Sequence, residues 1–358
     1  MREEWNDLVG RSGNPVHALR HEWLDAWWHG FGQSRDLYVL LAREGNEVIA
    51  VAPFMRSRQT LAGLPVRAMS FLGSTIDFLD FAVVRHPREC LDAFMSRALD
   101  GGADVVLVKG VPADGEHDQV LRDVLAERQT PYSTRVHHEV FIDTGDGFEA
   151  YKKGRSSKFW GNIRNRMKRL EQLAPLSFER YRHPFQSDLA LSAVFDLSRR
   201  SWKGDDGSAI GQQETYQRFF QRLYERLAVS QEVDVWLLRS GQTVIAYRFG
   251  FVDRDVFVES DVAYDKAFRA YSPGTLLAVH SNEALIREGV SEINLGLDFP
   301  WKREWNAERR PLLEFLVFPP GRLYPRIVRW WQELTDRFRR PPSDSPGSCP
   351  APHTTTVA

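Results

Sequence analysis

The sequence predicts a mixed α/β protein of the layered α+β kind, with mixed central sheets flanked by helices. Two observations support this fold class. Short runs of branched apolar residues, typical of strands, alternate with longer stretches whose apolar residues recur at helical spacing. Residues 38–50 and 234–246 also share Val, Leu, Arg, Gly, Val, Ile and Ala in register, and each copy reads as strand, turn and strand. The repeat predicts two domains of like topology.

The expected elements follow in chain order. The first domain, at residues 1–150, should hold helices at 16–31, 87–99 and 120–127 and strands at 103–109 and 136–142. A basic connecting helix is expected at 151–174. The second domain, at 175–324, should hold helices at 188–202, 214–228 and 276–288 and strands at 255–262, 291–297 and 312–318. An amphipathic helix at 325–340 precedes residues 341–358, which are rich in Pro, Ser and Thr and are expected to be disordered.

Composition excludes several classes of protein. The formal net charge of -1 gives no global attraction to nucleic acid or membranes, so electrostatic function must come from local clusters. Two cysteines, Cys90 and Cys349, cannot form a disulfide framework or, alone, a zinc site. No stretch approaches the roughly 18 uninterrupted apolar residues of a membrane span. We expect a cytoplasmic protein that uses no metal and can also lie at the periphery of the inner membrane.

The stretch from Arg269 to Thr275 is the first candidate site, because it stands between a strand-like and a helix-like run. The Ser272 hydroxyl can cap the helix by accepting from free amides of its first turn. Pro273 at the first helical position has no amide to leave unpaired, and Gly274 lets a ligand approach the backbone. A tight turn before a helix N-terminus predicts an anion site, for instance for a pyrophosphate. An ordinary capped helix is the alternative.

The second candidate site is the basic stretch at residues 152–170, which contains eight lysines and arginines and no acid. Its apolar residues recur at helical spacing, and Ser156 or Ser157 can cap its start. The pattern indicates an amphipathic helix whose basic face attracts phosphates, an anionic polymer or a membrane. We expect Lys158 and Arg164 to bind substrate. The alternative is a solvated face balanced by acids elsewhere.

The third candidate site follows the strand expected at 291–297, at a strand end where α/β sites tend to open. Lys302 could neutralise an oxyanion or hold a carboxylate or phosphate. Asp298 could orient an amine or Lys302, and Trp301 could contact the substrate. The alternative is a surface ion pair, with packing of the lysine stem on Trp301 and Trp305.

Together these segments resemble the GNAT N-acyltransferase superfamily, and more closely its branch labelled CelD/BcsL, which is related to the Fem aminoacyltransferases. The resemblance covers roughly residues 14–318 and implies two GNAT-like domains in tandem. Three signatures carry it: Asn14-Pro15 with Glu22 to Trp28, the basic segment from Ser157 to Leu170, and Ala270 to Leu277 continuing into Asp298 to Trp305.

The resemblance implies an acyl-CoA donor, such as acetyl-CoA, at the turn. Arg269 and Gly274 match the first and last positions of the superfamily's motif, Gln/Arg-x-x-Gly-x-Gly/Ala. Ser272 replaces the first glycine, and Pro273 removes an amide that could touch a phosphate. This departure leaves room for another donor, such as an aminoacyl-tRNA. The donor-binding residues implied are Arg269, Tyr271, Ser272, Gly274 and Thr275.

The implied chemistry is attack of an acceptor amine on a thioester or ester carbonyl. Fem enzymes carry a late aromatic-Lys-x-x-aromatic motif that residues 301–305 resemble, so Lys302 is implied to assist the transfer. Glu259 or Asp261 would accept the amine proton, and Tyr264 or Tyr271 would return one to the leaving thiolate. Strand alternation predicts that Glu259 and Asp261 lie on one face.

Three functions remain open. The first is an N-acyltransferase that moves groups other than aminoacyl groups from acyl-CoA to a small-molecule, glycan or peptide-precursor acceptor, in envelope polysaccharide or secondary metabolite synthesis. The second is Fem-like transfer from an aminoacyl-tRNA to a cell-wall precursor, with the basic helix holding the tRNA. The third is a non-catalytic partner in polysaccharide assembly. The helix at 325–340 either lies on an anionic membrane or packs on the core.

Overall fold

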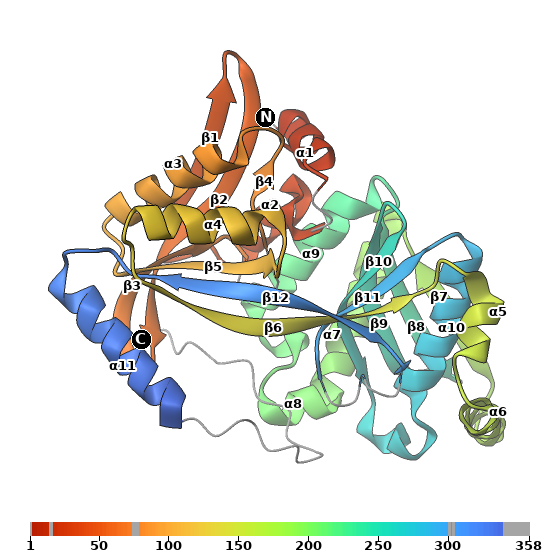
Figure 1. Ribbon diagram of the computed structural model, residues 1–358. Helices are drawn as coiled ribbons and strands as arrows, with labels where there is room; N and C mark the ends of the chain where they lie inside the picture. Colours follow the sequence, from red (N-terminus) through yellow and green to blue (C-terminus); the bar gives the residue numbers. More distant parts are fainter. Residues whose placement is uncertain (1, 14–16, 74–78, 300–301, 303–304, 339–358) are drawn as a thin grey trace. The chain divides into compact units, whose positions relative to one another are not determined.

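The computed structural model describes residues 2–13, 17–73, 79–299, 302 and 305–338 (Figure 1). The chain divides into two compact units. Unit 1 comprises Met1–Trp28, Gly32–His138 and Arg310–Ala358, and unit 2 comprises His29–Phe31 and Glu139–Arg309. This division differs from the expected consecutive domains. The basic helix belongs to unit 2 instead of linking two domains, and the last strand and helix belong to unit 1.

Unit 1 contains a mixed sheet in the strand order β1-β2-β3-β5-β12-β6, with β4 paired to β2. Its elements are α1 (Arg2–Arg11), η1 (His17–Leu19), α2 (His21–Phe31), β1 (Asp36–Glu44), β2 (Glu47–Leu61), β3 (Leu64–Phe71), β4 (Ala82–Val83), α3 (Pro87–Asp100), β5 (Val105–Pro112), α4 (Glu116–Glu127), β6 (Tyr132–Asp143), β12 (Glu308–Val317) and α11 (Leu323–Phe338). The last residues of α2 and β6 and the first of β12 are counted with unit 2.

Unit 2 contains a mixed sheet in the strand order β6-β11-β10-β9-β8-β7. Its elements are α5 (Gly147–Lys153), α6 (Ser157–Glu171), β7 (Leu176–Tyr181), η2 (Pro184–Gln186), α7 (Ser187–Arg200), α8 (Trp202–Asp206), η3 (Ile210–Gln212), α9 (Glu214–Ala228), β8 (Val233–Ser240), β9 (Thr243–Asp253), β10 (Val256–Tyr264), η4 (Lys266–Tyr271), α10 (Pro273–Arg287) and β11 (Glu292–Leu297).

Most expected elements are present, and three boundaries differ for local reasons. The helix expected at 16–31 begins at His21, because Arg20 is extended. The helix expected at 188–202 ends at Arg200, because Ser201 is extended and its hydroxyl accepts from the Lys203 amide to start α8. The basic stretch forms two helices, and α6 begins where the Ser156 hydroxyl accepts from the Phe159 amide. Residues 14–16 and 339–358, which include Asn14-Pro15, Cys349 and the expected tail, lie outside the described residues.

The internal repeat is confirmed down to its register. β1–β2 and β8–β9 are antiparallel hairpins, and Gly45 and Gly241 turn them with φ of 59° and 58°. Each hairpin bulges at the matching step, between Ala42 and Arg43 and between Leu238 and Arg239. Each then continues through an antiparallel strand, a helix and a parallel strand, namely β3, α3 and β5 or β10, α10 and β11. The two units therefore share one topology.

Helices cover both faces of the unit 2 sheet (Figure 1). Arg248 and Phe249 point to opposite faces of β9, because side chains alternate along a strand. Arg248 donates to Ser281 of α10, whereas Phe249 packs edge-on against Phe220 of α9 with ring centroids 4.8 Å apart. Thus α10 lies on one face, and α9 lies on the other with α7 beside it.

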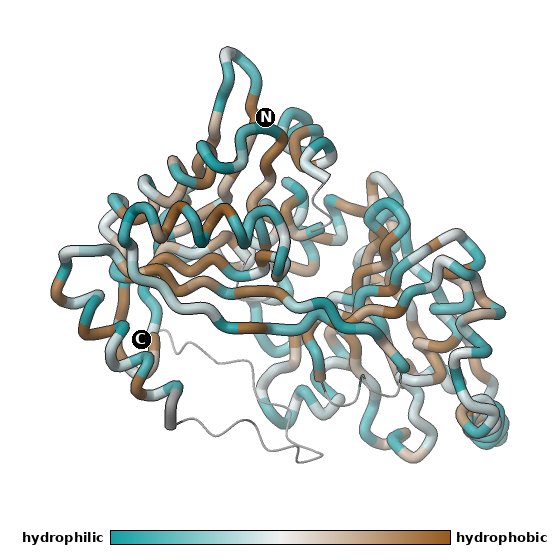
Figure 2. The backbone as a smooth tube through the Cα atoms, in the orientation of Figure 1, coloured by the Kyte–Doolittle hydropathy of each residue, from teal (hydrophilic) through white to brown (hydrophobic). Residues whose placement is uncertain are grey.

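Hydrophobic residues run along the strands of unit 1 (Figure 2), and its aromatic core encloses an ion pair. Phe54 of β2 and Phe71 of β3 stack at 4.9 Å, and both contact Phe81. Against Phe81 lies His117 of α4, whose Nδ1 is 2.7 Å from the buried Asp80 carboxylate. Burial alone would lower the pKa of His117, but the hydrogen bond and charge of Asp80 outweigh burial and raise it.

The last helix, α11, packs on unit 1 and also presents apolar side chains to solvent. Val328 is buried in a cluster with Val66 of β3, and the Trp331 indole donates to the Ala62 carbonyl at 2.9 Å. Ile327 and Trp330 are exposed, at 46% and 60%. One side of α11 thus packs on the core, as one of the two expectations for this helix has it, and another side exposes apolar residues to solvent. None of the helices in the described ranges has the length and apolarity needed to cross a bilayer.

Prediction: His117→Gln should destabilise the protein more at low pH than at high pH. Because the folded pKa of His117 is raised, its ion pair contributes fully below the unfolded value near 6.5 and is lost as pH rises through the folded pKa. We expect a loss of roughly 1–3 kcal/mol at about pH 6 and a smaller loss at about pH 9, measured by urea unfolding. Equal losses at both pH values would contradict this. The exposed control His29→Gln should show little change.

Candidate active site

The parallel strands β10 and β11 separate after a short paired stretch. Their register runs only from Val256–Val258 against Glu292–Asn294. Beyond it, β10 bulges at Ser260 against β9, and β11 bulges at Leu295 against β6. A bulge bends its strand and disrupts the local ladder. Beyond this level β10 and β11 are therefore not paired with each other, and we call this unpaired region between their far halves the opening.

Lys302 places its ammonium at the β11 side of this opening. Its Nζ donates to the Leu295 carbonyl and, at 2.6 Å, to the Leu297 carbonyl. The residue is only 4% exposed. Burial lowers the pKa of Lys302 to about 8, even though the negative charges of Glu259 and Asp298 oppose this change. A lysine with this pKa can exchange a proton near neutral pH.

Glu259 joins a polar network on the α10 face of the sheet. Its carboxylate accepts from Arg248 Nε at 2.8 Å. One terminal nitrogen of Arg248 donates to Ser281 at 2.7 Å and Asn282 at 2.6 Å, and Asn282 donates to the Tyr151 hydroxyl. Arg248 is 1% exposed, and its other terminal nitrogen is buried without a hydrogen-bond partner among the described atoms. Glu259 is thus a buried, paired carboxylate.

Asp261 lies on the opposite face, which corrects the expectation that it shares a face with Glu259. The bulge at Ser260 sets Glu259 opposite Gly250 but Asp261 opposite Phe249, so one extra residue reverses the alternation. Asp261 pairs with Lys203 of α8 and accepts from the Tyr247 hydroxyl. Burial first, and then the charge of Asp261, raise the pKa of Tyr247 well above its ordinary value.

The turn before α10 is built differently from the expectation in one respect. Pro273 occupies the start of the helix as expected, but Ser272 is left-handed, with φ 48° and ψ 55°, and its hydroxyl makes no capping bond. Thr275 is half-buried in the first turn, and Arg269 is exposed in η4. A Cβ on Gly274 would lie 3.5 Å from the Tyr264 ring, so Tyr264 packs over the helix N-terminus.

The basic helix and the turn, which the sequence presents as separate candidates, lie together in unit 2. The Arg169 guanidinium stands 5.1 Å from the ring centre of Tyr271. The apolar face of α6 packs in the same cluster as Phe268 and Tyr271. Five cations of α6 form no ion pair with any described residue: Lys158, Arg164, Arg166, Lys168 and Arg169.

Two of the eight cations in the basic stretch interact with other groups. The count of eight therefore overestimates the charge of its basic face. Lys152 pairs with Glu149 at 3.1 Å. Arg155 turns inward, stacks 3.7 Å from the Tyr151 ring centre, and donates to the carbonyls of Tyr151 and Trp305 at 2.7 Å each. Arg155 therefore holds the segment that carries Lys302.

The remaining predicted residues have separate placements. Asp298 pairs with Arg309 at 2.9 Å and acts on Lys302 through its charge. Trp301 lies outside the described residues. Trp305 is buried and packs edge-on against Phe159. Sequence reasoning missed Lys203 and Arg248; an arginine inside an apolar strand was a signal for Arg248, whereas nothing local marks Lys203.

The repeated topology, with a helix N-terminus after β10 and an opening beside β11, is that of the GNAT acyltransferase fold. Residues 157–303 match the family model of the Acetyltransferase (GNAT) domain. The mixed α/β fold with tandem GNAT-like units is thereby confirmed.

Solved structures extend the likeness to most of the chain. The chain is similar to FemX, with 10% identity, coverage of 93% of this chain and 98% of that one, and a TM-score of 0.62. It is similar to L-PGS from Bacillus licheniformis, with 14% identity, 93% and 96% coverage, and a TM-score of 0.57. A tandem GNAT protein from the clavulanic acid biosynthesis pathway matches with 13% identity, 90% and 95% coverage, and a TM-score of 0.52. These likenesses show the fold. No curated protein matches the sequence.

Prediction: Lys302→Met should change the stability of the folded protein more favourably near neutral pH than at about pH 10. The folded pKa of about 8 lies below the unfolded value of 10.5, so the buried ammonium lowers stability below pH 8, and this penalty disappears as pH rises toward 10.5. Relative to its effect at pH 10, the substitution should be more favourable at pH 7 by up to about 3 kcal/mol, because the cost of the two carbonyls left without a donor is the same at both values. Urea unfolding at about pH 7 and pH 10 measures it. An equal effect at both values would contradict the assignment, and the exposed control Lys158→Met should be neutral.

Proposed function

We propose that unit 2 transfers an acyl group from an acyl-CoA to an amine in the opening between β10 and β11. The single observation that carries the proposal is Lys302, a buried lysine with a pKa of about 8, held on the carbonyls of a bulged strand beside that opening. Perturbed titratable groups concentrate where proton transfer is needed. The GNAT domain supports acyl transfer as the reaction class.

The spacing within β10 favours a donor with a long arm. Tyr264 packs at the N-terminus of α10, where backbone amides and the helix dipole favour an anion. Glu259, whose charge acts on Lys302, lies five residues earlier, roughly 15 Å along the strand. A donor whose phosphates sit at the helix must therefore carry its acyl group on an extended chain, as the pantetheine of CoA does.

The residues supply a balanced proton path. The amine nitrogen attacks the thioester carbonyl, forms the C–N bond and leaves an oxyanion that the Lys302 ammonium stabilises. As the C–S bond breaks, Lys302 gives its proton to the departing thiolate, and the neutral amine of Lys302 then takes the proton released by the new amide nitrogen. An ordinary thiol has a pKa of about 8.5, so the transfer from a lysine with a pKa of about 8 is nearly isoenergetic.

The carboxylates serve better as supports than as the base. Glu259 is tied to Arg248, and Asp261 to Lys203 and Tyr247. Protonating either would leave a buried cation without its counter-ion. We therefore assign the proton transfers to Lys302 and assign to Glu259 and Asp298 the electrostatic support of its ammonium. Tyr264 remains an alternative proton donor to the thiolate.

A second candidate donor is an aminoacyl-tRNA, favoured by the basic face of α6. Five cations without ion pairs, one of them over Tyr271, present a positive surface next to the turn. Phosphate backbones bind such surfaces with little need for sequence-specific contacts. Pro273 also lacks an amide for a diphosphate. In this reading Lys158 and Arg164 hold the tRNA, and Trp301 contacts the acceptor.

We further propose that the acceptor is an amine of a glycan or peptide precursor, in the manner expected of the CelD/BcsL branch, and that α11 brings the protein to a membrane. Arg326 and Arg329 flank the exposed Ile327 and Trp330. Apolar side chains bordered by arginines fit the interface of an anionic bilayer.

Prediction: acetyl-CoA or a longer acyl-CoA should raise the melting temperature by roughly 5 °C or more at a hundredfold excess over Kd. Gly274→Glu should abolish the shift by placing a carboxylate where the phosphates bind. It should still fold, because a Cβ at this position would make only an ordinary van der Waals contact with Tyr264, and acids suit a helix start. Gly274→Ala should keep part of the shift, and Gly10→Glu on α1 should keep all of it. If no CoA shifts the wild type, the acyl-CoA donor is wrong, and tRNA binding would then favour the second donor.

Prediction: the wild type should sediment with phosphatidylglycerol vesicles and not with phosphatidylcholine vesicles. Replacing Ile327 and Trp330 by serine should weaken binding at least about tenfold, because each buries apolar surface in the bilayer. The matched control replaces Phe185 and Leu189, exposed apolar residues of unit 2, by serine and should bind normally. Equal loss in both variants would remove α11 as the contact surface.

A further inference from the structure

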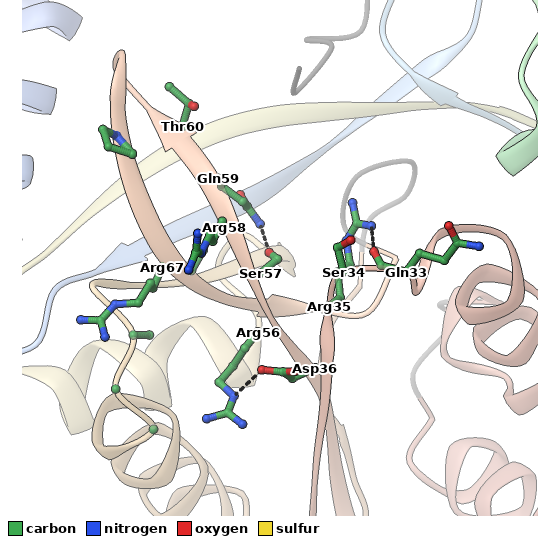
Figure 3. Close-up of a pocket in the computed structure, with 15 residues that line it drawn as sticks. Gln33, Ser34, Arg35, Asp36, Arg56, Ser57, Arg58, Gln59, Thr60 and Arg67 are labelled. Carbon is green, nitrogen blue, oxygen red and sulfur yellow. Dashed lines mark hydrogen bonds and ion pairs between the residues drawn. The ribbon is translucent and has the colours of Figure 1, made fainter. Parts of the chain in front are cut away.

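Unit 1 contains an arginine-rich pocket that acyl transfer in unit 2 does not use (Figure 3). Its volume is about 840 Å³. The start of β1, the far half of β2, the start of β3 and the residues after α3 line it. Four of its fifteen lining residues are arginines, Arg35, Arg56, Arg58 and Arg67, and Asp36 is its one acid. The pocket therefore carries a positive charge.

Two of the arginines face each other across the sheet. Arg58 of β2 pairs in register with Arg67 of β3, and Figure 3 shows their side chains side by side. Like charges directly opposite each other destabilise a strand pair. Arg67 is held by Asp104, with nitrogen–oxygen distances of 3.0 and 3.2 Å. Arg58 has no carboxylate within ion-pair distance in the described parts of the chain.

Of the other two arginines, Arg56 has only a weak ion pair and Arg35 is partly removed from water. Arg56 is 3.7 Å from Asp36, in an exposed pair of little strength, and stands over the Tyr38 ring at 5.3 Å. Burial lowers the pKa of Arg35, which stays protonated but has less water around its guanidinium. An anion would relieve the unfavourable clustering of the Arg56, Arg58 and Arg67 charges.

We propose that this pocket binds a phosphorylated, hydroxyl-rich small molecule of the sugar phosphate class. Guanidinium groups match phosphate oxygens in pairs, which explains the arginines. The Thr60 hydroxyl lies on the same face of β2 as Arg56 and Arg58, and Thr60 and Ser34 suit sugar hydroxyls. Ser57 and Gln59 alternate to the other face, where the Gln59 amide donates to the Ser57 hydroxyl. None of the fifteen lining residues is aromatic, so the pocket offers no stacking surface for a nucleobase. Its volume is that of a small-molecule site.

Calorimetry with glucose 1-phosphate and inorganic pyrophosphate tests the proposal, with glucose as the neutral probe. We expect saturable binding of both phosphates and none of glucose. Arg58→Gln should weaken the phosphates at least about tenfold, because it removes a charge-assisted contact. The control Arg254→Gln removes one exposed charge of unit 2 outside every proposed site and should change nothing. Unchanged affinity in Arg58→Gln, or no saturable binding of either phosphate to the wild type, would overturn the proposal.

A second measurement separates a ligand site from a structural role for Arg58. Without ligand, Arg58→Gln should raise the melting temperature by roughly 1 to 3 °C, because it removes repulsion from Arg67. An arginine that merely supports the fold would lower it on substitution, and that result would overturn the proposal. Vesicles of phosphatidylglycerol form the last arm. Because α11 alone is expected to bind these vesicles, the arm compares the wild type with Arg58→Gln. Weaker vesicle binding by Arg58→Gln, without binding of glucose 1-phosphate to the wild type, would assign the arginines to a lipid surface and would also overturn it.

Discussion

The hydrogen bonds from the Lys302 ammonium to the carbonyls of Leu295 and Leu297 are the interaction on which the site depends. Those carbonyls belong to the part of β11 that no longer pairs with β10. A parallel ladder that simply stopped would leave buried polar backbone unpaired, which is costly. The lysine satisfies these groups and at the same time brings a cation with a shifted pKa into the opening. The proposed chemistry and the local fold thus both require an ammonium group at the unpaired carbonyls of β11.

The two bulges explain why the polar networks stand where they do. If Ser260 were paired regularly instead of bulged, Glu259 and Asp261 would lie on one face of β10, and their two carboxylates would repel each other. The bulge gives each its own cation, Arg248 beneath α10 and Lys203 on α8. Charges of both networks act on the pKa of Lys302, because Glu259 raises it and Lys203 lowers it. Its proton affinity is therefore a balance set from both sides of the sheet.

The fold class, most elements and the repeat could be predicted from the sequence. Hydrophobic periodicity and the repeated hairpin pattern depend only on residues close together in the chain. Lys302 could be singled out because it stands in a recognisable motif at a strand end. The split between Glu259 and Asp261 could not, because alternation holds only while the register is regular. The capture of Arg155 by Tyr151 and Trp305, and the meeting of Arg169 with Tyr271, depend on packing between distant segments. For the same reason the return of the last strand to unit 1 could not be read from residue order.

Because the two hairpins bulge at matching steps, the two copies can be compared residue by residue. Register equates Ala50 with Ala246, so the positions of Tyr247 and Arg248 in unit 2 correspond to Val51 and Ala52 in unit 1. The backbones are alike, but only one copy carries ionisable side chains at the centre of its sheet. One copy of the repeated topology thus has buried ionisable groups at the centre of its sheet, where the charge of Arg248 must be compensated by Glu259. The other copy is apolar at these positions, and its buried ion pair, Asp80 with His117, lies outside the strands of its sheet.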